Sequence, residues 1–173
     1  MDINNQIELE VYFADHFDTI LFPVLADMYL KNNELGRSRK VCEIGLKHYP
    51  KDSAGLFVLA NIEKKEGNLK EVEKILGDVL LYAPDHLLAA IELCEIQTVL
   101  GRAKSRLLKS WKYVLHLDPS NQTAKEFIEK NDIPENNIKT PLKRSISKQK
   151  KVKVQPVLKK KPLSKKTIPT PIS

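Results

Sequence analysis

Three prolines recur at a nearly constant interval, and this interval constrains the fold more than any other feature of the chain. Pro50, Pro84 and Pro119 lie 34 and 35 residues apart, and each closes an amphipathic stretch. A fixed period of this size is typical of proteins that stack helical repeat units. The period therefore favours a surface built by stacking over a catalytic centre.

Between the prolines, apolar residues recur three or four positions apart, which is the spacing of one helix face. Short polar breaks at 31–36, 66–68 and 100–102 divide this pattern. Gly67 and Gly101 suit helix ends, because glycine closes the last turn in a left-handed conformation at little steric cost. Each unit therefore predicts two antiparallel helices joined by a tight turn, and the fold class is predicted to be all-α.

Helix starts are expected where a short oxygen-bearing side chain can accept hydrogen bonds from free backbone N–H groups. Candidate caps after the three prolines are Asp52 or Ser53, Asp85, and Ser120 or Asn121. Pro23 is tolerable in the first turn of its helix, where its missing N–H costs nothing.

The first 18 residues fit two patterns. Residues 7–11 alternate between polar and apolar side chains as a strand does. The second pattern is a helix, to which Val11, Phe13, Phe17 and Ile20 could equally belong. We expect a helix that packs on the first repeat.

Laid over one another, the three units share columns of similar side chains. The first helix holds Ala26, Ala60 and Cys94, preceded by Leu25, Leu59 and Leu93. The second helix holds Cys42, Leu76 and Trp111, then Gly45, Val79 and Val114. Over about residues 19–131 these columns make the chain resemble the tetratricopeptide repeat family. Tyr29 fills the family's aromatic column, whereas Glu63 and Gln97 depart from it.

The resemblance divides the chain into an α-solenoid of three helix pairs with extensions at both ends. The expected parts are an N-terminal segment at 1–18, repeats at 19–52, 53–86 and 87–121, a capping helix at 122–131, and a disordered tail at 132–173. The third repeat contains one extra residue, most simply placed near residues 102–106.

The resemblance also implies a right-handed superhelix whose first helices line a concave groove for a partner peptide or helix. The expected groove residues are Asp27, Leu30, Lys31, Phe57, Asn61, Lys64, Lys65, Leu88, Ile91, Glu95 and Thr98, with Ile20, Pro23, Ala54 and Val99 beside them. The lysine, asparagine and arginine clamp with which some members hold a chaperone's C-terminal carboxylate is missing, because Pro23 and Asp27 stand where it would begin. An equally open alternative is internal packing, with the final helix covering Leu88, Ile91 and Val99, and residues 1–18 covering Ile20 and Phe57.

The tail differs from the rest of the chain in charge. Residues 133–173 contain eleven lysines, one arginine and one glutamate, which gives +11. The whole chain carries +7, so residues 1–132 carry −4. The main basic positions are Lys150, Lys151, Lys153, Lys159, Lys160, Lys161, Lys165 and Lys166. Such a segment can contact nucleic-acid phosphates, an anionic membrane or a nuclear import receptor, or it can be a solubilising extension.

No pattern indicates catalysis. The chain has no phosphate-binding glycine loop, no nucleophile elbow and no paired histidines on one helix face. Asp15 and Asp18 are more simply a solvated face than a metal site, and Cys42 and Cys94 occupy packing columns. We therefore expect no enzymatic activity, no metal and no cofactor.

The N-terminus lacks the features of a secretion signal, and no apolar run approaches the roughly 20 residues that span a bilayer. Two unpaired cysteines fit a reducing compartment, so we expect a cytoplasmic protein. The preferred function is a non-enzymatic interaction module that binds a partner protein in the groove, with electrostatic contacts from the tail. The alternative is binding of nucleic acid or an anionic membrane by the tail, with the repeats as a carrier or dimerisation platform.

Overall fold

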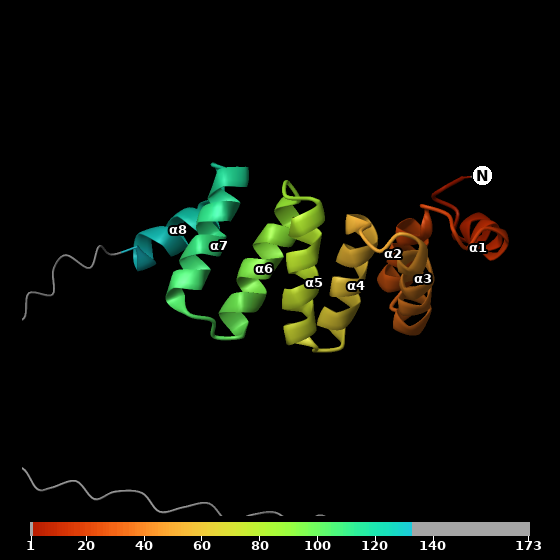
Figure 1. Ribbon diagram of the computed structural model, residues 1–173, viewed down its shortest axis with the longest axis horizontal. Helices are drawn as coiled ribbons and strands as arrows, with labels where there is room; N and C mark the ends of the chain where they lie inside the picture. The colour runs from red at the N-terminus through yellow and green to blue at the C-terminus, as the bar shows by residue number, and fades with distance from the viewer. Residues whose placement is uncertain (1, 133–173) are drawn as a thin grey trace, which may run out of the picture. The chain divides into compact units, whose positions relative to one another are not determined.

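The computed structural model describes residues 2–132, and every regular element within them is a helix (Figure 1). The predictions for residues 133–173, including the basic positions of the tail, lie outside this range. The helices are α1 (Gln6–Asp15), α2 (Phe22–Lys31), α3 (Leu35–His48), α4 (Ser53–Lys65), α5 (Leu69–Tyr82), α6 (Leu87–Val99), α7 (Lys104–Leu117) and α8 (Gln122–Asn131).

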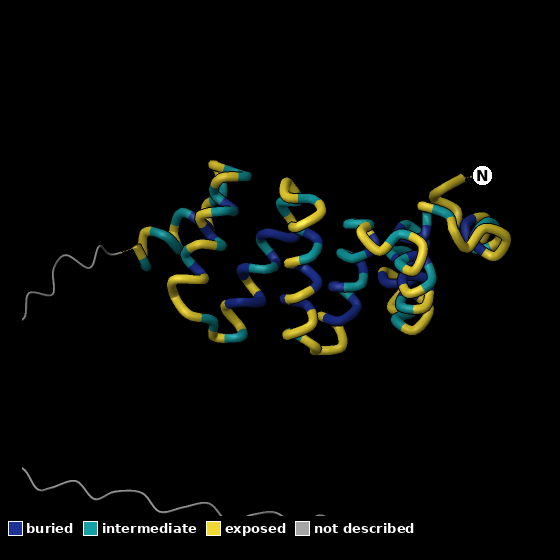
Figure 2. Tube along the Cα trace, viewed as in Figure 1, coloured by how far each residue is buried: buried dark blue, intermediate teal, exposed yellow. Residues whose placement is uncertain are grey.

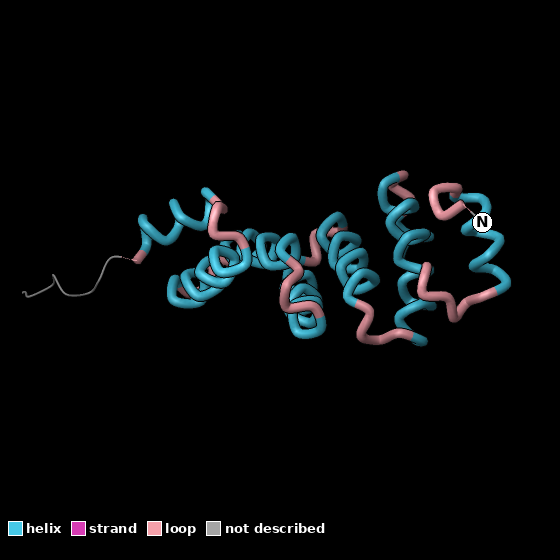
Figure 3. Tube along the Cα trace, turned by 90° about the horizontal axis from the view of Figure 1, so that it is seen from above, coloured by secondary structure: helices cyan, strands magenta, loops and turns pink. Residues whose placement is uncertain are grey.

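Each helix packs on its neighbours in chain order, and the predicted all-α helical repeat fold is confirmed. Short loops join the helices, as Figure 3 shows. Within residues 2–132, no helix combines the length and the apolar character needed to cross a membrane.

The turns inside the helix pairs repeat with the period of the prolines. Asn33, Gly67 and Gly101 have positive φ angles of 63°, 82° and 63°, and they lie 34 residues apart. Asparagine is one of the few residues other than glycine that tolerates this conformation, so the first unit makes the same turn without glycine. The extra residue of the third unit lies in the turn between α6 and α7, which spans 100–103 where the preceding turn spans 66–68.

The helix caps follow the same register. Asp52 Oδ1 accepts from the backbone N–H of Gly55 at 2.7 Å, and Asn121 Oδ1 accepts from Ala124 at 3.0 Å. The predicted cap Asp85 is wrong, because α6 begins at Leu87 and its N-cap position is therefore residue 86. His86 occupies that position, and its Nδ1 accepts from the backbone N–H of Ala89 at 3.1 Å.

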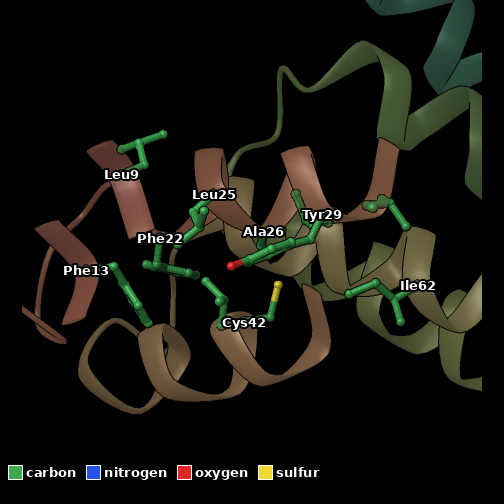
Figure 4. Packing of buried hydrophobic residues seen from close by; sticks show 11 residues of the cluster. Leu9, Phe13, Phe22, Leu25, Ala26, Tyr29, Cys42 and Ile62 are labelled. Atoms are coloured by element: carbon green, nitrogen blue, oxygen red, sulfur yellow. The ribbon is translucent and has the colours of Figure 1, made fainter. Parts of the chain in front are cut away.

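Residues 6–15 form a helix rather than a strand. The Asn5 side chain caps α1 by accepting from the backbone N–H groups of Ile7 and Glu8. Leu9 and Phe13 are buried and join the core formed by α2 and α3 (Figure 4). The predicted face is only partly right, because Val11, Phe17 and Ile20 are exposed.

The tightest packing surrounds the fully buried ring of Phe22, which begins α2 (Figure 4). A Cβ atom added to Gly45 of α3 would lie 2.0 Å from this ring, and one added to Gly55 of α4 would lie 2.4 Å from it. These two glycines therefore let three helices approach around one aromatic side chain. Pro23 follows Phe22 as the second residue of the helix, where proline is tolerated.

We predict that Gly45→Ala destabilises the protein by about 1–3 kcal/mol, because the new methyl group must displace a ring that has no free space. Gly36→Ala is the matched control in the same helix, since nothing lies within 4 Å of its added Cβ. The control should change the free energy of unfolding by less than about 1 kcal/mol, because Gly36 lies in the first turn of α3, where helix propensity counts less than in the interior. Urea unfolding measures both changes, and a Gly45→Ala variant as stable as the parent would contradict this packing.

Candidate partner-binding surface

The expected groove residues lie on α2, α4 and α6, the first helices of the three pairs (Figure 1). We call the exposed positions among them, together with Ile20 and Val99, the first-helix face. On α6, Leu88 is 63% exposed and Val99 is 70% exposed, with Ile91 partly buried between them. The alternative in which the final helix covers Leu88 and Val99 is therefore wrong.

Ile20 gives the same result at the other end of the face. It is 67% exposed, so residues 2–18 do not cover it. Figure 2 shows that α1 also has exposed positions. Apolar side chains thus remain uncovered at both ends of the first-helix face.

The part of the face contributed by α2 is smaller than expected. Leu30 is only 6% exposed and packs in the core, so its assignment to the groove is wrong. Pro23 is buried as well. Asp27 and Lys31 form an exposed ion pair of 2.6 Å along the helix. This helix therefore offers polar groups whose charges compensate one another.

The residues on α4 are held by contacts within the fold. The Phe57 ring lies 4.7 Å from the His86 ring between centroids and packs partly buried on the core of α5 and α6. The Asn61 amide donates to the Phe57 carbonyl oxygen at 3.1 Å. Phe57 therefore contributes to internal packing, but it packs on α5, α6 and His86, whereas the packing alternative expected residues 1–18 to cover it.

Two expected groove lysines connect neighbouring first helices. Lys64 Nζ lies 2.6 Å from Glu92 Oε1 of α6, and Lys65 Nζ donates to the Leu30 carbonyl oxygen of α2 at 3.1 Å. On α6, Glu95 and Thr98 are exposed, and the Thr98 hydroxyl donates to the Cys94 carbonyl oxygen. The lysines therefore hold the helices together, and Glu95 is the exposed carboxylate beside the apolar positions of α6.

Ion pairs between units are a feature that the sequence reasoning missed. Arg39 of α3 pairs with Glu63 of α4 and with Glu66, the C-cap of that helix, at 2.6 Å in both cases. Glu73, at the same position of α5 and 34 residues later, pairs with Arg102 and Arg106 of the next unit. The same repeat position therefore carries a cation, Arg39, in one unit and an anion, Glu73, in the next. Only the spatial arrangement relates the members of each pair, because the partners are separated by 24 to 33 residues in the chain.

The departures from the aromatic column have polar partners. Glu63 is 8% exposed and accepts from Arg39 and from the Asn68 side chain. The Arg39 guanidinium holds the pKa of the Glu63 carboxyl below its usual value. Gln97 is buried, and its Oε1 accepts from the Ser110 hydroxyl at 2.8 Å. Hydrogen bonds therefore compensate for the aromatic packing that these positions lack.

The groups considered for chemistry do not assemble into a site. Cys42 and Cys94 are fully buried in separate parts of the core, and burial raises the pKa of each thiol to about 12. Across the described part of the chain, no three His, Cys, Asp or Glu side chains gather closely enough to hold a metal ion. His16 stacks on Tyr12 instead, with 4.4 Å between the ring centroids.

In comparisons with known proteins, no protein-family model and no curated protein matches this sequence. The resemblance to tetratricopeptide repeats therefore stays a prediction, supported by the repeat columns and by the packing of the helix pairs.

We predict that Arg39→Met destabilises the protein by about 1–3 kcal/mol at neutral pH, because a mostly buried carboxylate loses its principal partner. The pairing lowers the pKa of Glu63 below 4.5, so its contribution is present above that pH and is lost as the pH falls through the lowered value. The stability difference between the two proteins should therefore shrink below about pH 4.5.

Urea unfolding over a range of pH values tests this expectation. Lys40→Met, which removes a positive charge from the exposed neighbouring position, should change stability by less than about 0.5 kcal/mol. A difference for Arg39→Met that stays constant into the acid range would show that Glu63 is not the group responsible.

The burial of the two cysteines leads to a separate prediction about thiol reactivity. A thiol with a pKa of about 12 is almost entirely protonated at about pH 8, so a disulfide reagent should react about a thousandfold more slowly than with free cysteine. Denaturing guanidinium should restore the normal rate for both thiols. Rapid labelling of the native protein would contradict the burial of Cys42 and Cys94.

Proposed function

We propose that this protein is a non-enzymatic interaction module of the tetratricopeptide repeat type, which binds a peptide or helix of a partner protein on the first-helix face. The observation that carries the proposal is the exposure of Leu88 and Val99 on α6. These residues lie 11 positions apart, which corresponds to about 16 Å along a helix. That length suits two or three side chains of a bound segment.

The composition of α6 supports the same proposal. Apart from Glu92 and Glu95, its 13 residues are apolar or uncharged. A helix that is apolar on all sides is ordinarily buried. Here Ala90 and Cys94 pack in the core shared with α7, and Ile96 packs in the core shared with α4 and α5. The side that neither core covers still carries Leu88 and Val99. Packing within the described residues does not account for Leu88 and Val99, whereas a partner would.

The chemistry of the face indicates the kind of partner. Its exposed aliphatic side chains alternate with Glu95, Thr98 and the Lys64–Glu92 pair. A segment with apolar side chains and a few polar groups matches this mixture better than a highly charged one. The main contribution would come from burying Leu88 and Val99, at about 25 cal/mol per Å² of apolar surface.

The tail enters the proposal only as a source of additional electrostatic contacts. Its lysines lie outside the described residues, so the proposal rests on the helices alone.

We predict that Leu88→Ser combined with Val99→Ser weakens partner binding by at least about tenfold, because the most exposed apolar contacts are removed. Peptides selected from a displayed random library against the parent protein provide the ligands, and fluorescence anisotropy measures their affinity. Both positions are exposed, so the free energy of unfolding should change by less than about 1 kcal/mol. Phe57 and Ile91 are less suitable, because each is partly buried in the core.

Leu81→Ser is the matched control, since Leu81 is a 68% exposed leucine on α5. It should leave the affinity of the selected peptides unchanged. Selected peptides that bind the Leu88 and Val99 variant as tightly as the parent would place the binding surface elsewhere.

A further inference from the structure

A second surface lies on the side of α6 away from Leu88 and Val99. There, a groove of about 570 Å³ opens between α5 and α7. Leu80 of α5 and Ala90 and Leu93 of α6 line it with apolar groups, and Arg106, Lys109 and His116 of α7 line it with basic ones. None of these residues belongs to the first-helix face, so the groove does not depend on the function proposed above.

The charge of α7 is one-sided. Its 14 residues include four lysines and arginines and His116, but no aspartate or glutamate. Arg106 is exposed, and Lys109 and His116 are exposed on the same helix. The carboxylate of Glu73 on α5 pairs with Arg102 as well as with Arg106. Lys112 of the same lining pairs with Asp132, whereas Lys109 has no ion-pair partner among the described residues. The basic edge of the groove therefore retains positive charge.

The groove follows α7 from Arg106 to His116. Arg106 pairs with Glu73 of α5, and the Tyr113 hydroxyl donates to the Pro84 carbonyl oxygen. Arg106 and His116 are ten residues apart, which corresponds to about 15 Å along α7. The groove thus has the length of about three helical turns.

We propose that this groove binds an acidic peptide segment that inserts a large apolar side chain between two or more carboxylates. The apolar side chain would contact Leu80, Ala90 and Leu93, and the carboxylates would pair with Lys109, His116 and the exposed part of Arg106. Complementary charge across such a contact favours association and selects the partner. Burial of the apolar side chain supplies affinity that charge alone does not.

The shape and composition of the groove favour a peptide over other anionic ligands. Leu80, Ala90 and Leu93 form an aliphatic floor. Among the described lining residues, Tyr113 is the one tyrosine, phenylalanine or tryptophan, and its hydroxyl is held by the Pro84 carbonyl oxygen, so the groove offers no series of aromatic faces for stacked bases. The space of about 570 Å³ between α5 and α7 suits a single inserted side chain better than the flat surface of a bilayer. All basic residues of the lining belong to α7. They therefore suit an amphipathic segment that carries its acidic residues on one side.

The test uses the full-length protein and three fluorescein-labelled synthetic peptides at physiological salt. The first carries two leucines one helical turn apart, flanked by glutamates. The second replaces the glutamates with glutamines, and the third replaces the leucines with alanines. The lysines of residues 133–173 attract the first and third peptides alike, so a preference for the first over the third reports the apolar floor.

We expect the first peptide to bind with a dissociation constant on the order of 10 μM, and each altered peptide to bind at least about tenfold more weakly. Lys109→Gln combined with His116→Gln should lower the affinity for the first peptide about tenfold. Lys104→Gln, at the start of the same helix and outside the groove, should change its affinity by less than about twofold. Circular dichroism should show the same helical signal for all variants.

Equal binding of all three peptides, or an equal loss with Lys104→Gln and with the paired groove variant, would overturn the proposal. So would binding of phosphatidylserine vesicles or duplex DNA that depends on Lys109 and His116 when the peptides do not bind. Absence of peptide binding by the parent protein would exclude the groove as a site for acidic segments.

Discussion

No helix pair in this protein can bury its apolar surface alone, and most of the structure depends on this constraint. Each core cluster draws residues from more than one unit. Val58 and Ile62 of α4 complete the core of α2 and α3, and Ala89 and Ile96 of α6 complete that of α4 and α5. A unit out of register by one residue would turn its apolar side away from the neighbour. The 34-residue period therefore follows from packing.

Small residues make this packing possible where helices approach most closely. Ala26, Ala60 and Cys94 are fully buried at one position of the three first helices. The glycines around Phe22 do the same for a larger side chain. Polar contacts then set the register further, because the pairs of Arg39 and Glu73 join one unit to the next. Apolar burial supplies stability, and these partly buried ion pairs connect particular positions of neighbouring units.

Local features of the fold were predictable from the sequence, and contacts between units were not. Gly67 and Gly101 indicated the turns, because glycine is the usual residue where the backbone is left-handed at a helix end. The spacing of the apolar residues indicated the helices. Asn33 makes the same turn with a residue that carries a weaker signal. Asp85 was mistaken for a cap because aspartate usually caps helices, whereas the register places His86 there.

The candidate surface was predicted less well for a physical reason. Repeat position indicates which side of a helix a residue occupies, but it does not indicate how deeply the next unit covers that residue. Leu30 and Leu88 both stand at expected groove positions, yet one is buried and the other exposed. Glu73 and Arg102 gave no sign of pairing, because helical spacing relates residues three or four apart and these are 29 apart.

The helix α6 connects these arguments. Its small residues Ala90 and Cys94 face the core shared with α7, and Leu93 joins Ala90 at the floor of the groove beside α7. Its opposite side carries Leu88 and Val99 into solvent.

In a stacked repeat the first helix is held between two second helices, so both of its remaining sides are available. A helix with two charged residues in 13 can therefore be well packed and still present two surfaces of different chemistry. One surface is aliphatic with a nearby carboxylate, and the other is an apolar floor beside a basic edge. Partners that differ in charge would then distinguish the two sides of one helix.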